Sequence, residues 1–232
     1  VIHCSPSHHY PTGRVMPISK RYELLGWVTK TKDRYIIEDE YDSELRLNGK
    51  PIPSLQSIDV SGKVIYMNTF SKTLCSTVRI SYMVLPDELA ERFYRELSFY
   101  SCTVSNFEQY TLAQFMNSGA FEKHINRLRN YYQNKRDAIL EIFKTAPLDQ
   151  YITIKEEDSG VHFMMKLKTD RTEMDMISDA KSKGIKLAPL SKYFVDQTSN
   201  MNFQNVYVMN YSSIDLEQLP LIFDALCQVL IK

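Results

Sequence analysis

Short apolar runs and amphipathic stretches alternate along the first part of the chain. The apolar runs have few polar positions on either face, which is typical of strands buried on both sides of a parallel sheet. Between them, apolar residues recur at helical spacing, as Leu24, Leu25 and Val28 do. Strands alternating with helices predict an α/β fold with a mainly parallel sheet. The expected strands are Val1–His3, Tyr35–Ile37, 62–70 and 79–86, and the expected helices are 18–31 and 87–99.

The pattern changes after Pro147. Two long helical stretches precede this residue, and the second carries apolar residues at helical spacing into the C-terminal part. After it, apolar strands are mixed with two helices, which predicts a small α+β domain. We therefore place a boundary within the long helix, with a first domain at 1–130 and a second at 131–232. The expected helices are 106–118, 120–145, 173–183 and 215–231, and the expected strands are 151–155, 161–167 and 206–211.

The composition limits what this chain does. Its 232 residues carry a formal net charge of zero and no basic stripe of the kind that binds a phosphate backbone. The cysteines are widely spaced without a C-x-x-C pair, which argues against a zinc site or a disulfide framework and is typical of the cytoplasm. No apolar run has the length of a membrane span. The chain opens directly on a strand at Val1, so we expect a natural fragment or a trimmed piece of a longer protein.

Side chains with complementary chemistry follow the predicted strands. Asp39 comes after the apolar run Tyr35–Ile37, and Lys72 comes after the run "VIYM". Ligands of parallel α/β sheets bind at the carboxyl ends of the strands, so both residues are expected at one edge of the sheet. Tyr41 lies near Asp39 in the sequence, and three polar residues flank or follow Lys72: Thr69, Ser71 and Arg79.

One cofactor uses this whole set of groups. Pyridoxal phosphate forms a Schiff base with a nucleophilic lysine amine. A carboxylate at its pyridine nitrogen keeps that nitrogen protonated, so that the ring withdraws electrons. Its phosphate takes hydroxyl groups and the guanidinium fork of an arginine. The sequence therefore predicts a pyridoxal 5'-phosphate site around Lys72.

Ordered motifs carry a resemblance to a known family. "TFSKTLCSTVRISY", "SHHYPTG" and "IIEDEYDSELR" resemble the lysine motif, the Pro-Thr-Gly loop and the acid-and-tyrosine strand of fold type I pyridoxal-phosphate aminotransferases of class I/II. With "HINRLRNYYQNKRD", they resemble more narrowly the MocR/GabR group of GntR-family transcriptional regulators. The resemblance covers nearly the whole chain. It implies the back half of the mainly parallel large domain, followed by the small α+β C-terminal domain.

The resemblance implies a role for each candidate on the ring side of the cofactor. Lys72 would be the catalytic residue and form the internal aldimine. Asp39 would pair with the pyridine nitrogen, and Tyr41 would contact the ring hydroxyl. His8 would lie near the ring or near a bound effector. No metal ligand is implied.

The phosphate side and the partners are implied in the same way. Thr69, Ser71 and Arg79 would hold the phosphate. Proteins of the MocR/GabR group carry an N-terminal winged-helix domain, so DNA would be bound only through a domain that this chain lacks. The resemblance also implies a homodimer and the sensing of a small amino compound or amino acid.

The chain also departs from the family pattern. Tyr10 stands where many aminotransferases have asparagine, and Ser81 stands where a glycine is usual. The arginine that grips a substrate carboxylate falls on Val208, and no arginine follows Arg171. Turnover is therefore the doubtful part of the function. Two alternatives to a sensor remain: a genuine amino-acid aminotransferase, and a degenerate dimerisation module without cofactor.

Several residues also have simpler interpretations. Thr69 and Lys72 could form a nucleophile and base, and "EDEYDSE" could be a metal site or a solvated turn, although no partner motif accompanies either. His8 and His9 could be ordinary loop residues, and Arg79 could form a salt bridge at the sheet edge. The acids around Asp39 are expected to be surface or structural residues. The basic residues at 127–136 are expected to form a solvated or interface helix face rather than a DNA site.

Overall fold

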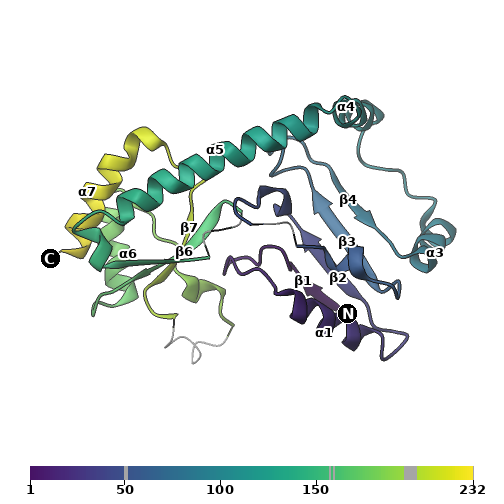
Figure 1. The fold of residues 1–232 in the computed structure, drawn as a ribbon, viewed down its shortest axis with the longest axis horizontal. Coiled ribbons are helices and arrows are strands. Elements are labelled where there is room, and N and C mark those ends of the chain that lie inside the picture. The colour runs from purple at the N-terminus through teal and green to yellow at the C-terminus, as the bar shows by residue number, and fades with distance from the viewer. Residues whose placement is uncertain (50–51, 157, 159, 196–202, 232) are drawn as a thin grey trace. The chain divides into compact units, whose positions relative to one another are not determined.

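The computed structural model describes residues 1–49, 52–156, 158, 160–195 and 203–231 (Figure 1). The chain forms two compact units, which we call unit 1 and unit 2. Unit 1 contains Val1–His9 and Arg14–Arg129, and unit 2 contains Tyr10–Gly13 and Asn130–Lys232. The long helix α5 (Ala120–Phe143) carries the chain from one unit to the other.

Unit 1 contains a four-stranded sheet in the order β1-β2-β3-β4. The strands β1 (Ile2–Cys4), β2 (Ile36–Glu40) and β3 (Val64–Thr69) are parallel, with Asp39 paired to Met67 in the register. The mainly parallel sheet is therefore confirmed. Since β2 and β3 run in the same direction, their carboxyl ends lie at the same edge of the sheet.

The strand β4 (Ser81–Val84) differs from the prediction of a buried parallel strand. It pairs with β3 in the antiparallel direction, and all of its residues are exposed. The connection from Thr69 to Ser81 contains no helix. A parallel crossover needs a dozen or more residues, usually with a helix, so this short connection returns the chain antiparallel. The apolar run at 79–86 thus belongs to an exposed strand at the edge of the sheet.

Helices α1 (Ile18–Val28) and α2 (Leu55–Ile58) pack on one face of this sheet. The apolar stripe of α1 is buried against strand residues, as predicted from the helical spacing. This core contributes roughly 1.5–3 kcal/mol for each fully buried aliphatic side chain. Its buried members are Leu25, Val28, Ile36, Leu55 and Val64.

Acidic side chains share this buried face, which the sequence did not indicate. The strand β2 continues through Glu40 instead of ending at Ile37, so Asp39 lies within the strand. Alternate residues of a strand point to opposite faces, and Glu38 and Glu40 are buried on the core side. Glu38 accepts hydrogen bonds from the backbone amides of Leu55 (2.7 Å) and Gln56 (2.8 Å). These acids are therefore structural, and the surface alternative is wrong for them.

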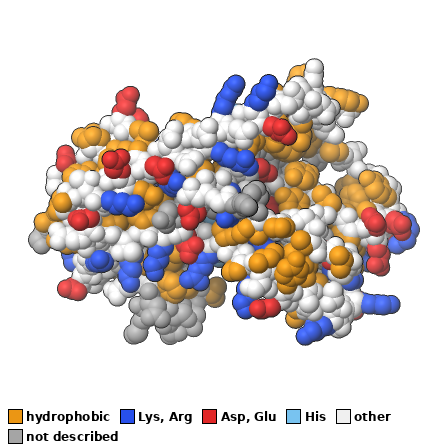
Figure 2. All heavy atoms as spheres, in the orientation of Figure 1, with side chains coloured by type: hydrophobic (Ala, Val, Ile, Leu, Met, Phe, Trp, Pro, Cys, Tyr) orange, Lys and Arg blue, Asp and Glu red, His pale blue; other side chains and the backbone are white. Residues whose placement is uncertain are grey.

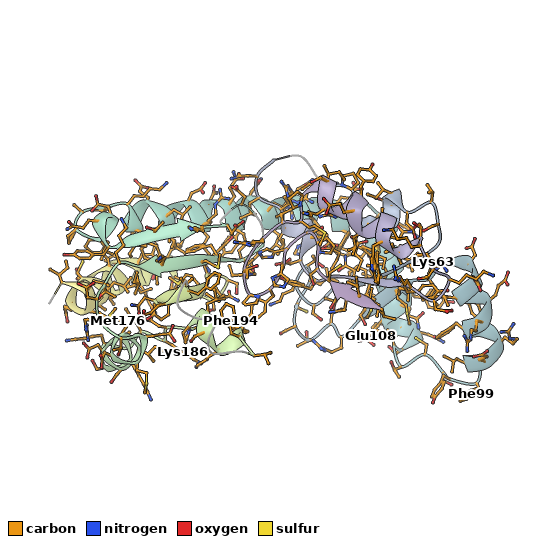
Figure 3. The ribbon with its side chains drawn as sticks, turned by 90° about the horizontal axis from the view of Figure 1, so that it is seen from below. Lys63, Phe99, Glu108, Met176, Lys186 and Phe194 are labelled. Atoms are coloured by element: carbon orange, nitrogen blue, oxygen red, sulfur yellow. The ribbon has the colours of Figure 1, made fainter. Side chains whose placement is uncertain are left out.

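Helices α3 (Asp87–Leu97) and α4 (Asn106–Asn117) occur where the sequence predicts them, but neither has a buried residue. Apolar and aromatic side chains on and between them are largely exposed. Figure 2 shows hydrophobic side chains gathered over the part of unit 1 that Figure 1 labels β4 and α3. Phe99, labelled in Figure 3, follows α3 and is 73% exposed. Unit 1 therefore presents a large apolar surface.

The described part of unit 2 contains an antiparallel sheet in the order β5-β6-β7, two further helices and the C-terminal part of α5. The strands are β5 (Ile152–Lys155), β6 (His162–Leu167) and β7 (Val206–Asn210), and the helices are α6 (Glu173–Ser182) and α7 (Leu219–Leu230). Met176 on α6 is fully buried, whereas Lys186 after it is exposed (Figure 3). Short 3-10 turns lie at Ser43–Leu45, Leu148–Gln150, Leu190–Tyr193 and Leu216–Gln218.

The basic stretch of α5 is less solvated than the sequence suggests. Lys135 and Arg136 are only 3% and 4% exposed. The Lys135 ammonium donates to the Ser212 carbonyl (2.8 Å), and the Arg136 guanidinium pairs with Asp137 (2.7 Å). The solvated alternative is therefore wrong for these two residues, because long basic side chains can bury their stems when the charged ends find partners.

None of the helices in the described ranges combines the length and the apolar character needed to cross a membrane.

Candidate functional site

The Lys72 side chain projects from the loop that follows β3. Lys72 is exposed, and among the described residues no hydrogen bond or ion pair holds its ammonium group. The next residue, Thr73, is buried, and its carbonyl contacts the His124 imidazole of α5 (2.7 Å). The backbone beside Lys72 is thus anchored, while the amine itself is left available.

Two hydroxyl groups and a guanidinium converge beside Lys72. The Thr69 hydroxyl lies 3.2 Å from the Ser71 hydroxyl, and the Arg79 guanidinium donates to the same Ser71 oxygen (3.2 Å). Ser71 in turn donates to the Val78 carbonyl (3.2 Å). The hairpin from β3 to β4 therefore brings together three candidates that are separated in the sequence. Hydroxyls and an arginine are the donors that a phosphate group takes.

Asp39 lies on the open face of β2, at the same sheet edge as the Lys72 loop. Its carboxylate accepts a hydrogen bond from the imidazole of His3 on β1, with 3.0 Å between Nε2 and Oδ2. Both side chains are partly exposed. His3 is not among the candidates that the sequence indicates, because the strand register that brings it to Asp39 cannot be read from the sequence.

Tyr41 and His8 lie together, as part of a hydrogen-bonded group. The Tyr41 hydroxyl donates to the His8 carbonyl (2.7 Å), and the two rings stack with centroids 5.9 Å apart. The His8 imidazole contacts both carboxylate oxygens of Asp42 at 3.0 and 2.8 Å. Asp42, which the sequence suggested only as a surface or structural residue, is buried and fixes His8 against Tyr41.

Glu40 ties the loop before the Pro-Thr-Gly motif to β2. Its carboxylate accepts a hydrogen bond from the backbone amide of Ser7 (3.2 Å), the residue that precedes His8. Burial raises the pKa of the Glu40 carboxyl to about 7, and the nearby charge of Glu38 acts in the same direction. The chain therefore holds a titratable carboxyl under the loop that carries His8.

Tyr10 of the Pro-Thr-Gly loop belongs to unit 2. Its hydroxyl lies 2.6 Å from the hydroxyl of Tyr193, and this hydrogen bond raises the pKa of Tyr10 to about 12. Tyr10, one of the residues that depart from the aminotransferase pattern, is thus hydrogen-bonded to another phenol.

The candidate positions for binding a carboxylate in unit 2 are apolar or already paired. Val208 is buried in β7. Arg171, the last arginine of the chain, pairs with Asp179 of α6 and donates to the carbonyl of Val229 on α7 (3.0 Å). Arg171 therefore holds two helices of unit 2 together.

The chain matches a known protein family over most of its length. The model of the family described as aminotransferase class I and II matches residues 1–216. The chain belongs to this family. Kynurenine aminotransferase from Pyrococcus horikoshii has the same fold, with a TM-score of 0.81 and 24% identity over 99% of this chain and 55% of that one. The aromatic aminotransferase Aro9 from C. albicans has a TM-score of 0.84 and 18% identity, again over 99% of this chain and 55% of that one. The fold type I assignment is confirmed.

Regulators are among the most similar members of this family. An uncharacterized HTH-type transcriptional regulator of Bacillus subtilis, YhdI, is 39% identical over 85% of this chain and 42% of its own length. The probable rhizopine catabolism regulatory protein MocR of Rhizobium meliloti is 33% identical over 93% of this chain and 42% of its own length. The chain spans less than half the length of these relatives. The resemblance to the MocR group of regulators is confirmed.

Proposed function

We propose that this chain is the pyridoxal-phosphate-binding, aminotransferase-like domain of a MocR-type transcriptional regulator, and that it senses a small amino compound. The convergence of Thr69, Ser71 and Arg79 beside the available amine of Lys72 carries this proposal. The regulators among the relatives support the sensory role over metabolic turnover.

The residues of unit 1 fit this cofactor. A phosphate needs hydroxyl and guanidinium donors, and these lie within hydrogen-bonding distance of one another. A pyridine nitrogen needs a carboxylate, and Asp39 presents a partly exposed one at the same sheet edge. When bound, pyridoxal phosphate would supply a carbonyl that captures amines and a ring that withdraws electrons.

Each residue then has a defined task. Lys72 would supply the amine to which the cofactor attaches. Asp39 would accept a hydrogen bond from the ring nitrogen and keep that nitrogen protonated. Tyr41, whose hydroxyl donates to the His8 carbonyl, would contact the ring hydroxyl of the cofactor. These tasks are binding and orientation, which a sensor needs as much as an enzyme does.

The apolar residue at the position of the carboxylate-binding arginine argues for sensing. A substrate carboxylate is usually held by a bidentate arginine, and charge-assisted hydrogen bonds of this kind contribute roughly 1.5–3 kcal/mol. Val208 offers no charge, and Arg171 is occupied by Asp179. The carboxylate of an amino acid would therefore be held less firmly here than in an aminotransferase that has this arginine. Weaker binding of the substrate disfavours repeated turnover.

The whole protein is part of the proposal. DNA would be bound by a separate domain, consistent with relatives that are more than twice as long as the matched region. A homodimer is proposed from the large apolar surface of unit 1, and a cytoplasmic location from the cysteine pattern. Residues 1–130 and 131–232 would be the end of the large domain and the small domain.

The first test is the visible absorption of the full-length protein with added pyridoxal phosphate. We expect the wild type to give the absorption of bound cofactor and Lys72→Ala to lose it, because the amine is the attachment point. Lys63→Ala, at the start of the strand β3 that leads to the loop, is the matched control and should bind as the wild type does.

The same sample then separates sensor from enzyme. Amino acids are added singly, and keto acid release is measured alongside the spectrum. A spectral change without steady keto acid release supports the sensor. Steady release identifies an aminotransferase instead, and identical spectra for wild type and Lys72→Ala would contradict the cofactor site altogether.

A further inference from the structure

His3 and Asp39 form a pair across two neighbouring strands. His3 is in register with Ile37, so it lies beside Asp39 on the face of the sheet opposite the buried Glu38 and Glu40. A carboxylate only accepts hydrogen bonds, so the imidazole must carry its hydrogen on Nε2, which lies 3.0 Å from Oδ2. Among the described residues, no other side chain or amide is bonded to this carboxylate.

Stability does not account for this pair. The side chains of His3 and Asp39 are 60% and 40% exposed. Partly exposed ion pairs of this kind contribute little to folding, commonly less than about 1 kcal/mol. The pair does have a geometric effect, since the bond to Oδ2 fixes the plane of the carboxylate and leaves Oδ1 for another donor.

We propose that His3 is a positioning residue that orients the Asp39 carboxylate toward the ring nitrogen of the cofactor. This inference rests on the proposed function. It adds a residue that is not among those assigned to cofactor binding from the sequence motifs. Partners of this kind, which hold the group that contacts a ligand, are a general way to preorganise a site. His3 acts only through Asp39 and makes no contact with the cofactor itself.

The test compares two substitutions of His3 in the full-length protein. His3→Phe keeps the ring shape but removes the donor, whereas His3→Gln keeps an N–H at a reach similar to that of Nε2. We expect His3→Phe to weaken pyridoxal phosphate binding about five- to tenfold, as the loss of one charge-assisted hydrogen bond allows. His3→Gln should bind within about twofold of the wild type. Lys20→Met, which removes the exposed pair with Glu23, is the control and should not change binding.

Two further measurements separate positioning from a structural role. The melting temperature of the cofactor-free protein should change by no more than about 3 °C in His3→Phe, because the pair is exposed. In an Asp39→Asn background, which binds cofactor more weakly, His3→Phe should cause no additional loss of affinity.

The outcomes distinguish this inference from the function on which it rests. If the wild type fails to bind pyridoxal phosphate through Lys72, the proposed function and the role of His3 are both wrong. If the wild type binds and His3→Phe binds equally well, or weakens binding as much in the Asp39→Asn background as in the wild type, the positioning role is overturned and the cofactor site stands. Loss of affinity that His3→Gln avoids supports the proposal.

Discussion

Three consecutive acids, Glu38, Asp39 and Glu40, have different roles in β2 because successive side chains of a strand point to opposite faces. Asp39 faces the open side and meets His3. Glu38 and Glu40 face the core, where burial raises the pKa of both carboxyls. The sequence motif singles out Asp39 by resemblance, but only the pleat of the strand explains why its neighbours cannot replace it.

Glu40 predicts how stability depends on pH. Its pKa is about 7 in the folded protein against 4.5 for an ordinary glutamate, so the folded state keeps a proton that the unfolded state releases. Stability should therefore fall as pH rises from about 4.5 to about 7, by an amount on the order of 3 kcal/mol from this group. Glu40→Gln, which cannot ionise, should be the more stable protein above pH 7. Urea unfolding at pH 5 and pH 8 measures the difference.

The control for this prediction is Glu23→Gln, which replaces an exposed glutamate of α1. It should keep the pH dependence of the wild type. If Glu40→Gln also keeps that dependence, the buried carboxyl is not its source.

At the scale of elements, the helices and strands with a clear period lie where the sequence predicts them, as α5 and β6 do. The partner of each strand and the direction of pairing were harder to predict. The direction of β4 depends on its connection to β3, and the apolar run of 79–86 looks the same in either direction. The short helix α2 was missed entirely, since four residues are too few for a periodic pattern. Its conformation depends on Glu38 from another element.

This dependence can be tested on α2. Glu38→Ala removes the acceptor of two backbone amides and leaves Arg21 buried without the carboxylate that lies 3.8 Å from it. We expect a loss of about 3–5 kcal/mol, as for other buried pairs broken on one side. Ser54→Ala removes only the side-chain cap of α2, which is exposed, and should cost about 1 kcal/mol. Chemical denaturation should rank the two; equal losses would show that the pair with Arg21 contributes little.

At the scale of the whole molecule, the exposed apolar surface of unit 1 is the dominant feature. It comes from β4, α3, α4 and the segment between the helices, where Tyr94, Phe99 and Phe107 are 72%, 73% and 80% exposed. Monomeric proteins rarely leave apolar patches larger than a few hundred Å² open to water. The surface is therefore expected to be covered in the working protein.

Residues 1–232 alone should consequently bind the dye ANS and form aggregates larger than a dimer, whereas the full-length homodimer should do so much less. Dye fluorescence and light scattering at matched concentrations make the comparison. Phe99→Ser with Phe107→Ser should reduce dye binding by the short chain, and Met174→Ser, at an exposed position of α6 in unit 2, should not. Equal dye binding by the short and full-length proteins would contradict the idea that the surface is covered.

The sequence by itself determined the α/β order and the mainly parallel sheet and supplied the candidate residues around Lys72, because hydrophobic period and local motifs are properties of neighbouring residues. Only the tertiary structure decided which strands pair, in which direction and in which register. Those choices brought His3 to Asp39, Asp42 to His8, and Thr69 to Ser71 and Arg79. They also buried Glu38 and Glu40, since burial of a charge depends on partners far along the chain, such as Arg21 and the amides of α2.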